Sequence, residues 1–320
     1  MLEKYKIMFI GDIHWRWENP INRKDDYRQE LKSLVIESLL MAEEIKCDGV
    51  IFLGDIFDRE EPSGSVRNEV LNLFNKKPDG NPWSFDKYVV VGNHDISGQN
   101  PDTIYRTALG TLIDSGIVKC ETFIEKYSIF CGHYINKIEE QDWSSNDALI
   151  YAMHANILEN PFFEGNYVLI NDFQTHENTK LVISGHYHPG NSPIIREDDV
   201  VFANPGSLCR ISAIQANIER QIQIAVVDVD KDQISIEYKP LQSAKNSEDI
   251  FDLNKVQVNK ERRLDAKSLR EKIAELRVRN VQEKSDDPCQ DFIKFAKEMD
   301  ASEEEIAIVI DELQSIISSE

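Results

Sequence analysis

The residues of this chain best suited to chemistry are carboxylates, imidazoles and one amide that follow short apolar runs. These residues are Asp12, His14, Asp55, Asn93, His94, His154, His186 and His188. Oxygen and nitrogen donors of these kinds, with no thiolate among them, suit Mn²⁺, Fe, Zn²⁺ or Mg²⁺. The set is larger than one ion requires, and it fits two ions held roughly 3.5–4 Å apart. We therefore expect two divalent metal ions at one site.

Two pairs of these residues have a spacing that puts both members on the same side of extended backbone. Asp12 and His14 are two residues apart, and so are His186 and His188. Side chains alternate between the two sides of extended backbone, so the members of each pair point the same way. Each pair can therefore supply two neighbouring ligands.

Buried strands have to position these side chains. Apolar, β-branched or aromatic runs occupy residues 7–10, 50–53, 88–91, 149–153, 181–184 and 200–203. Continuous runs of this length are typical of strands buried on both faces. Helical patterns lie between them at residues 27–45, 65–74 and 103–115, and residues 221–229 and 233–238 indicate a hairpin. Functional groups of open α/β sheets gather beyond the carboxyl ends of the strands, so residues distant in sequence can converge there.

The chain changes character after residue 243. The preceding part has the pattern of a layered α/β domain, whereas residues 258–284 are highly charged and locally basic, and residues 289–320 are acidic with a helical apolar pattern. We expect a catalytic domain over residues 1–243, a linker around residues 242–249 and a charged helical appendage over residues 244–320. The basic stretch is either a solvated helix face or a contact for nucleic acid or a partner.

The composition is that of a water-soluble protein of the cytoplasm. No apolar stretch approaches the roughly 20 residues that cross a bilayer, and the N-terminus lacks the pattern of a signal peptide. The five cysteines are scattered without a C-x-x-C pair, which indicates free thiols in a reducing compartment. The net charge of −21 disfavours nucleic-acid binding unless positive charge is concentrated locally.

Five motifs carry a resemblance to a known family. In chain order they are Gly11-Asp12-Ile13-His14, Gly54-Asp55-Ile56-Phe57-Asp58, Gly92-Asn93-His94-Asp95, the lone His154 and Gly185-His186-Tyr187-His188. In their order and approximate spacing the chain resembles the calcineurin-like metallophosphoesterase superfamily from residue 7 to about residue 241. The resemblance implies an αββα sandwich and a hydrolase of phosphate esters with two bound metal ions, Mn²⁺ being the first expectation.

The resemblance also implies which residues hold each ion. One metal would be held by Asp12, His14 and His188, the other by Asn93, His154 and His186, and both by a bridging Asp55. The two ions would polarise the phosphate and lower the pKa of a bridging water, whose hydroxide attacks phosphorus in line.

His94 is the expected catalytic residue that is not a metal ligand. It would face the scissile phosphate and stabilise or protonate the leaving oxygen. Asp58 and Asp95 could hold its imidazole in place, although Asp58 could also be a plain surface carboxylate.

Within the superfamily the chain is most similar to the SbcD-type exonuclease subunit of DNA repair. Residues 54–63, the Gly-Asn-His-Asp form at 92–95 and the turn at 204–207 carry this similarity. Trp15, Glu60 and Asp95 depart from the motifs of protein serine/threonine phosphatases. The similarity implies a DNA exo- or endonuclease that works in a repair or defence complex with an SMC-like ATPase, which we expect to bind the appendage. A phosphatase or phosphodiesterase of small molecules, a partner-binding scaffold and a homodimer remain open.

Three further features have more than one interpretation. His133 follows an apolar run and is expected to be a hydrogen-bonded histidine of the core or rim, whereas His176 is expected in a loop. The tripeptide Trp15-Arg16-Trp17 next to His14 could stack on nucleobases or belong to a packed loop.

Overall fold

The structure, a computed structural model, describes residues 3–160 and 165–253. These residues belong to one compact unit, Met1–Leu253. The appendage expected from the sequence lies outside the described residues from position 254 on, and the basic stretch 258–284 lies outside them entirely. Among the described residues, no helix combines the length and the apolar character needed to cross a membrane.

The first of two large sheets contains the first and the last strand of the described chain. Its strand order is β13-β12-β1-β2-β3, with β1 at Lys4–Ile10, β2 at Gly49–Phe52, β3 at Asp86–Val89, β12 at Gln223–Asp230 and β13 at Gln233–Pro240. β1, β2 and β3 are parallel, so their carboxyl ends meet at one edge. β12 and β13 form the expected hairpin, which pairs antiparallel to β1.

The second sheet has the strand order β10-β11-β9-β6-β5-β4. Its strands are β4 (Phe123–Ile124), β5 (Ile129–Gly132), β6 (Ile150–His154), β9 (Leu181–Gly185), β10 (Asn191–Ile195) and β11 (Val201–Asn204). The four central strands are parallel, and only the edge strands β4 and β10 run antiparallel to their neighbours. A separate two-stranded ribbon pairs β7 (Ile157–Leu158) with β8 (Val168–Leu169).

The alternation of side chains along β1 shows how the layers are joined. Ile7 and Phe9 pack between the two sheets, against buried residues of the second sheet. Met8 and Ile10 point the other way, into the core beneath the helices. Because both faces of the strand are buried, its sequence is a continuous apolar run rather than an alternating one.

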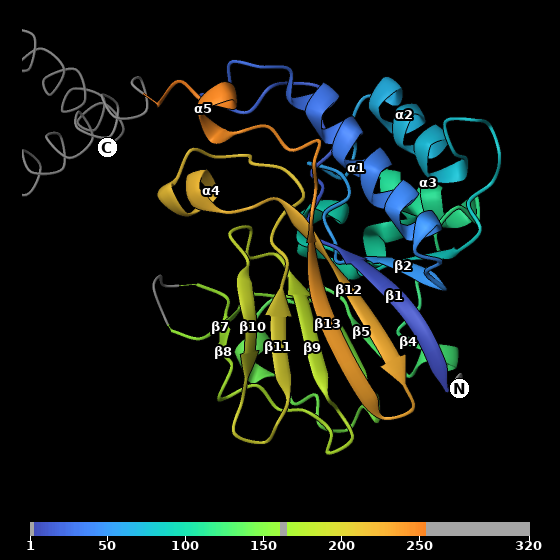
Figure 1. The fold of residues 1–320 in the computed structure, drawn as a ribbon, viewed down its shortest axis with the longest axis vertical. Coiled ribbons are helices and arrows are strands. Elements are labelled where there is room, and N and C mark those ends of the chain that lie inside the picture. Colours follow the sequence, from blue (N-terminus) through green and yellow to red (C-terminus); the bar gives the residue numbers. More distant parts are fainter. Residues whose placement is uncertain (1–2, 161–164, 254–320) are drawn as a thin grey trace, which may run out of the picture. The chain divides into compact units, whose positions relative to one another are not determined.

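The helices cover the outer face of the first sheet (Figure 1). They are α1 (Tyr27–Glu44), α2 (Gly64–Asn75) and α3 (Ala108–Asp114). The first two confirm the helices expected from the sequence. The third begins later than expected because Thr107 caps α3 by accepting a hydrogen bond from the Gly110 N–H, and a 3₁₀ helix (Pro101–Arg106) precedes it.

The outer face of the second sheet is covered mainly by loops and the β7–β8 ribbon. Its apolar cluster includes Phe130, Tyr151 and Phe202 and is completed by residues such as Trp143 and Phe173 between the strands. The layered α/β fold class expected from the sequence is therefore confirmed, with an outer layer over the second sheet that is largely non-helical in the part of the chain described.

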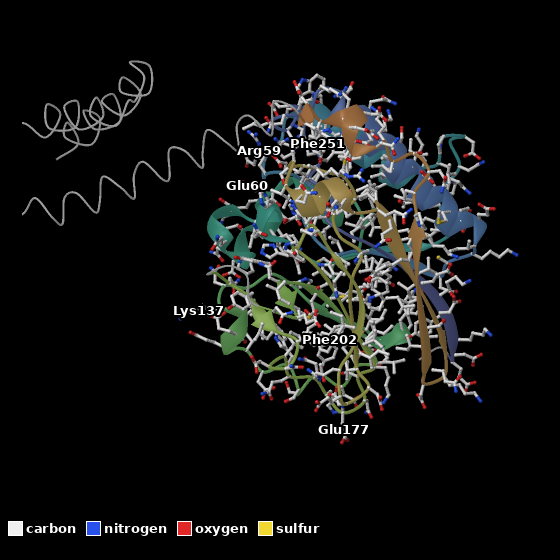
Figure 2. The ribbon with its side chains drawn as sticks, turned by 60° about the vertical axis from the view of Figure 1, so that its left-hand side comes forward. Arg59, Glu60, Lys137, Glu177, Phe202 and Phe251 are labelled. Carbon is white, nitrogen blue, oxygen red and sulfur yellow. The ribbon has the colours of Figure 1, made fainter. Side chains whose placement is uncertain are left out.

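The segment that the sequence suggested as a linker packs on the domain. The Gln242 and Ser243 N–H groups donate to the Glu37 carboxylate, at 2.6 and 2.7 Å. Phe251, which follows α5 (Ser247–Ile250), is buried (Figure 2), and the Lys24 N–H donates to the Ile250 carbonyl at 2.8 Å. The chain therefore stays on the domain to about residue 252.

Candidate metal centre

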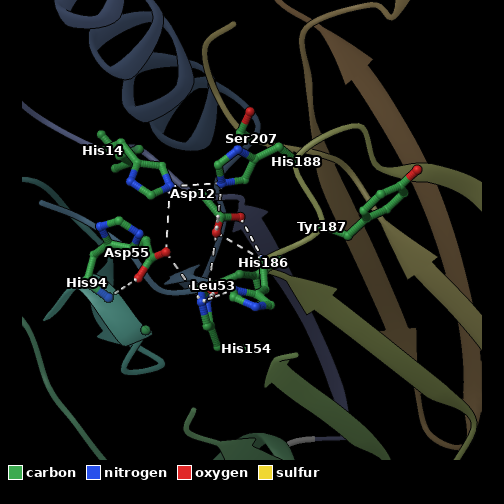
Figure 3. A network of polar contacts seen from close by, with 12 residues as sticks. Asp12, His14, Leu53, Asp55, His94, His154, His186, Tyr187, His188 and Ser207 are labelled. Atoms are coloured by element: carbon green, nitrogen blue, oxygen red, sulfur yellow. Dashed lines mark hydrogen bonds and ion pairs between the residues drawn. The ribbon is translucent and has the colours of Figure 1, made fainter. Parts of the chain in front are cut away.

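The carboxyl ends of four strands bring the expected metal-binding residues together. Asp12 follows β1, Asp55 follows β2, His154 ends β6 and His186 follows β9 (Figure 3). Asp12, Asp55 and His154 are almost fully buried. The parallel strands of the two sheets thus end at one edge, where their polar residues face one another.

The first cluster consists of Asp12, His14 and His188. One donor atom from each lies within 4.8 Å of the other two. His14 Nε2 lies 2.9 Å from His188 Nε2, and His188 Nε2 lies 4.0 Å from Asp12 Oδ1. This is the set expected to hold one metal ion.

The second cluster consists of Asp55, His154 and His186, with Asn93 beside them. His154 Nε2 lies 3.1 Å from His186 Nδ1, 3.2 Å from Asn93 Oδ1 and 3.5 Å from Asp55 Oδ2. The Leu53 carbonyl lies 2.7 Å from the other ring nitrogen of His154 and accepts its proton, which orients Nε2 toward the cluster.

Asp55 connects the two clusters. Its Oδ2 lies 3.6 Å from His14 Nε2 and 3.5 Å from His154 Nε2. Its Oδ1 accepts a hydrogen bond from the His94 N–H at 2.9 Å. A single carboxylate therefore reaches both groups of donors.

The spacing of these donors fits bound cations. Two ligands about 2.1 Å from one ion and at right angles are about 3.0 Å apart. The pairs His14–His188, His154–His186 and His154–Asn93 have separations of 2.9, 3.1 and 3.2 Å. These separations therefore match those of donors that share one cation.

The chain also matches a family model. The model, described as calcineurin-like phosphoesterase, covers residues 5–190 and with them every donor in the two clusters. This chain belongs to that family.

Solved structures that match this phosphoesterase share little sequence with it. A dimetal phosphatase from Danio rerio is 12% identical, over 74% of this chain and 96% of that one, with a TM-score of 0.46. A metallophosphoesterase from Sphaerobacter thermophilus is 14% identical, over 75% and 89% of the two chains, with a TM-score of 0.33. A comparison with curated proteins gave no match.

Three residues of the phosphoesterase site have a left-handed backbone. The φ angles are 51° at His14, 49° at Asp55 and 73° at His186. This conformation costs a non-glycine residue of the order of 1–3 kcal/mol and persists only where surrounding contacts hold it. At His14 those contacts include the buried Tyr27 hydroxyl, which is shared between the Ile13 and His14 carbonyls at 3.2 Å each.

Two glycines of the motifs leave room for the donors. A Cβ on Gly54, whose φ is +102°, would lie 2.1 Å from His154 Nδ1. A Cβ on Gly92 would lie 2.0 Å from Asp55 Oδ1. No side chain fits at either place, so these glycines of the motifs keep open the space that Asp55 and His154 occupy.

The electrostatics of the phosphoesterase site depend on burial and on Asp55. Burial lowers the pKa values of His14, His186 and His188, so these imidazoles are neutral and ready to bind a cation. Burial opposes charge on His154 as well, but the adjacent Asp55 carboxylate outweighs it and raises the pKa of His154 to about 9. The same pairing holds the pKa of Asp55 well below its usual range despite its burial.

His94 is held by a backbone carbonyl and not by a carboxylate. Its Nδ1 donates to the Asp58 carbonyl oxygen at 2.7 Å. A neutral imidazole has one N–H, so Nε2 carries no proton and is free to face a ligand. The Asp58 carboxylate instead accepts from Arg16 Nη1 at 2.8 Å and lies 3.7 Å from His14 Nδ1. From the sequence we expected the side chains of Asp58 and Asp95 to hold this imidazole. In the structure a main-chain carbonyl holds it instead.

The Asp95 carboxylate holds two backbone segments together. Its Oδ2 accepts hydrogen bonds from the Asp55 and Gly92 N–H groups, both at 2.9 Å. Burial and the nearby Asp55 charge raise the pKa of Asp95 to about 7. The residue thus ties the loop after β2 to the loop after β3.

Two histidines lie apart from the clusters, as expected. His133 Nδ1 accepts from the Val91 N–H at 3.1 Å, and His176 Nδ1 accepts from the Asn178 N–H at 3.2 Å. Sequence reasoning missed Tyr134, whose ring centroid lies 5.6 Å from that of His186 and 6.1 Å from that of His154. Neither its type nor its spacing signalled a place beside the site.

Proposed function

We propose that this protein hydrolyses phosphodiester bonds of DNA, as the nuclease subunit of an SbcCD-like complex. The observation that carries the proposal is the pair of donor clusters joined at Asp55, with His94 fixed beside them. The similarity of residues 54–63 to SbcD-type subunits supports DNA as the substrate. The metal donors favour two divalent cations, with Mn²⁺ as the proposed pair.

Each residue then has a distinct part in hydrolysis. Two bound cations would supply Lewis acidity and lower the pKa of an attacking water. Asp12, His14 and His188 hold one site, Asn93, His154 and His186 hold the other, and Asp55 belongs to both. His94 Nε2 faces the leaving oxygen and stabilises or protonates it, with the ring orientation fixed by the Asp58 carbonyl.

The test is hydrolysis by the full-length protein with Mn²⁺. Linear and circular DNA are compared with bis-p-nitrophenyl phosphate and p-nitrophenyl phosphate, and Asp55→Asn is the inactive control. We expect turnover of the diester and cleavage of DNA, with linear and circular forms distinguishing exo- from endonuclease action. Turnover of the monoester alone would contradict the proposal and favour a small-molecule phosphatase.

The proposed partners are tested separately. We propose that residues 254–320 bind an SMC-like ATPase. The ATPase would provide the affinity for DNA that an acidic chain of net charge −21 lacks. Co-purification with a candidate ATPase, with and without these residues, measures this directly. No DNA cleavage with or without such an ATPase would leave only the simpler phosphoesterase activity.

A further inference from the structure

The two tryptophans beside His14 have opposite surroundings. Trp15 is fully buried, and its indole N–H donates to Glu69 Oε2 at 3.2 Å. Trp17 is 54% exposed. The Arg28 guanidinium carbon lies 3.9 Å from the centroid of the Trp17 ring. The packed-loop interpretation therefore applies to Trp15, whereas Trp17 offers a flat aromatic surface that a cation supports.

The Arg28 side chain that supports the Trp17 ring is itself held in place by an acidic residue. Arg28 Nε lies 3.8 Å from Glu69 Oε2, the same oxygen that accepts from Trp15. Glu69 belongs to α2, so it ties Arg28 of α1 and the loop of Trp15 to one rigid element. The indole of Trp17 thus rests on an anchored side chain, which lowers the entropy lost when a ligand stacks on it.

The loop that carries Trp17 is locked to the loop that carries Asp55. The His14 N–H donates to the Asp55 carbonyl at 2.8 Å, and the Asp58 N–H donates to the Trp15 carbonyl at 3.2 Å. Trp17 is three residues from His14, so their Cα atoms are at most about 11 Å apart. The loop that carries Trp17 therefore begins at a metal-binding residue and is joined to the loop of Asp55.

The residue between the two tryptophans carries a guanidinium to the edge of the metal centre. Arg16 Nη1 is 2.8 Å from Asp58 Oδ1, which is 3.7 Å from His14 Nδ1. A cation next to a phosphate-binding centre and an aromatic face beside it are the two elements with which proteins bind the backbone and the bases of single-stranded nucleic acid.

We propose that Trp17, backed by Arg28, is a stacking platform for a nucleobase attached to the phosphodiester bound at the metal centre. The inference rests on the proposed diesterase function and specifies its substrate class, a diester that carries a base. The base stacks on the exposed face of Trp17. Because every base has such a face, the platform selects nucleotides without selecting sequence.

Kinetics on two diesters with one leaving group test the platform. The substrates are thymidine 5′-(p-nitrophenyl) phosphate and methyl p-nitrophenyl phosphate, with full-length protein and Mn²⁺. We expect Trp17→Ala to raise KM for the thymidine ester about tenfold, the effect of losing one stacked base. kcat for that ester, and both constants for the methyl ester, should stay unchanged.

Two variants serve as controls. Trp17→Phe keeps an aromatic face and should keep most of the affinity for the thymidine ester. Ile195→Ala removes an apolar side chain that is 69% exposed on β10 and should change neither substrate's KM. An unchanged KM for the thymidine ester in Trp17→Ala would overturn the proposal, and so would an equal rise for both esters.

A binding measurement separates the platform from catalysis. With metal removed by EDTA, a thymidine dinucleotide and a thymidine oligonucleotide should each quench the indole fluorescence that Trp17→Phe lacks. Tighter binding of the oligonucleotide identifies a nucleic-acid strand as the source of the base, and equal binding identifies short nucleotides. Quenching without hydrolysis of either ester would refute the diesterase function but retain the platform, and no quenching by either ligand would refute the platform.

Discussion

Asp55 uses its two carboxylate oxygens for different purposes. Oδ2 lies 3.6 and 3.5 Å from nitrogens of His14 and His154, one from each cluster. Oδ1 accepts from the His94 N–H and so helps to fix the loop that carries Asn93. The residue has to be a carboxylate because an amide offers one oxygen where two are used.

Asp55→Asn is expected to abolish hydrolysis and to lower metal content at both positions. The neutral amide removes the one charge that both cations would share. Metal analysis of the purified protein and turnover of a chromogenic diester measure the two effects. Asp230→Asn, a change at an exposed aspartate of β12, is the control. Two tightly bound ions with normal turnover would show that Asp55 does not bridge.

His94→Ala is expected to separate metal binding from chemistry. His94 lies close enough to His14 and Asp55 to be a ligand itself, but its proposed role is to protonate the leaving oxygen. Its loss should slow turnover by roughly 10²–10⁴-fold while both ions remain bound. A parallel fall of metal content and activity would instead make His94 a ligand.

His133 makes a pH-dependent contribution to stability. Burial lowers the pKa of His133 to about 4, below the ordinary value of 6.5. Between these values the unfolded chain binds a proton that the folded chain does not, so stability falls as pH drops through this window. The contribution lost between pH 7 and pH 5 is about 2 kcal/mol.

His133→Asn should weaken that pH dependence. The Asn oxygen can replace Nδ1 as the acceptor of the Val91 N–H without titrating. Urea unfolding at pH 7 and pH 5 measures the change in the free energy of unfolding. If both proteins lose the same stability between the two pH values, other groups account for the whole effect.

At the scale of elements, the loops after the strands are what shape the site. Asp95 holds the loops after β2 and β3 together through the Asp55 and Gly92 N–H groups. The left-handed backbone at His14, Asp55 and His186 turns each loop sharply after its strand. The donors are therefore placed by backbone contacts, and a small change in one loop displaces a donor from another.

Gly92→Ala and Gly64→Ala form a matched pair that tests this packing. The added methyl of Gly92→Ala would meet Asp55 Oδ1 at 2.0 Å, whereas at Gly64, the first residue of α2, it meets nothing within 4 Å. We expect Gly92→Ala to weaken Mn²⁺ binding by roughly 10–100-fold. Gly64→Ala should leave it unchanged. Calorimetric titration with Mn²⁺ measures the affinity of both variants. Equal affinities would show that the loop shifts to accommodate the added methyl group.

At the scale of the whole molecule, the domain boundary follows from the packing of residues 244–251. The Lys245 N–H donates to buried Glu30 at 2.9 Å, and Arg210 Nη1 donates to the Lys245 carbonyl at 3.0 Å. Ile250 and Phe251 are buried in the same region. A boundary after residue 243, as the sequence suggests, would remove two core side chains and these backbone contacts.

Two truncations are expected to behave differently. Removal of residues 254–320 should leave thermal stability and turnover of a small diester intact, but abolish ATPase binding and activity on long DNA. Removal of residues 244–320 should cost about 3–6 kcal/mol, the burial of two large apolar side chains. Thermal melts and diester kinetics of both proteins test this. Loss of small-diester turnover in a folded protein ending at Leu253 would mean that the removed residues complete the site.

The sequence by itself determined the strands that precede the donors, their order along the chain and the donors at their ends. Buried parallel strands need continuous apolar runs, and metal sites need a narrow set of residue types, so both leave local signals such as residues 50–53 followed by Asp55. The layered α/β fold class follows from these signals, and the family follows from the order of the five motifs. The helix expected over residues 103–115 was broken by Thr107, a local cap that periodicity does not register.

Only the tertiary structure decided which atoms meet. His94 is held by the Asp58 carbonyl and not by the Asp58 carboxylate. This contact depends on how the loop of Asp58 lies against the loop of His94, which is 36 residues further along the chain. Trp15 is buried and bonded to Glu69 of α2, whereas Trp17 is exposed and supported by Arg28 of α1. Such contacts join residues that are distant in sequence, and their geometry is set by the packing of whole elements rather than by the residue types on either side.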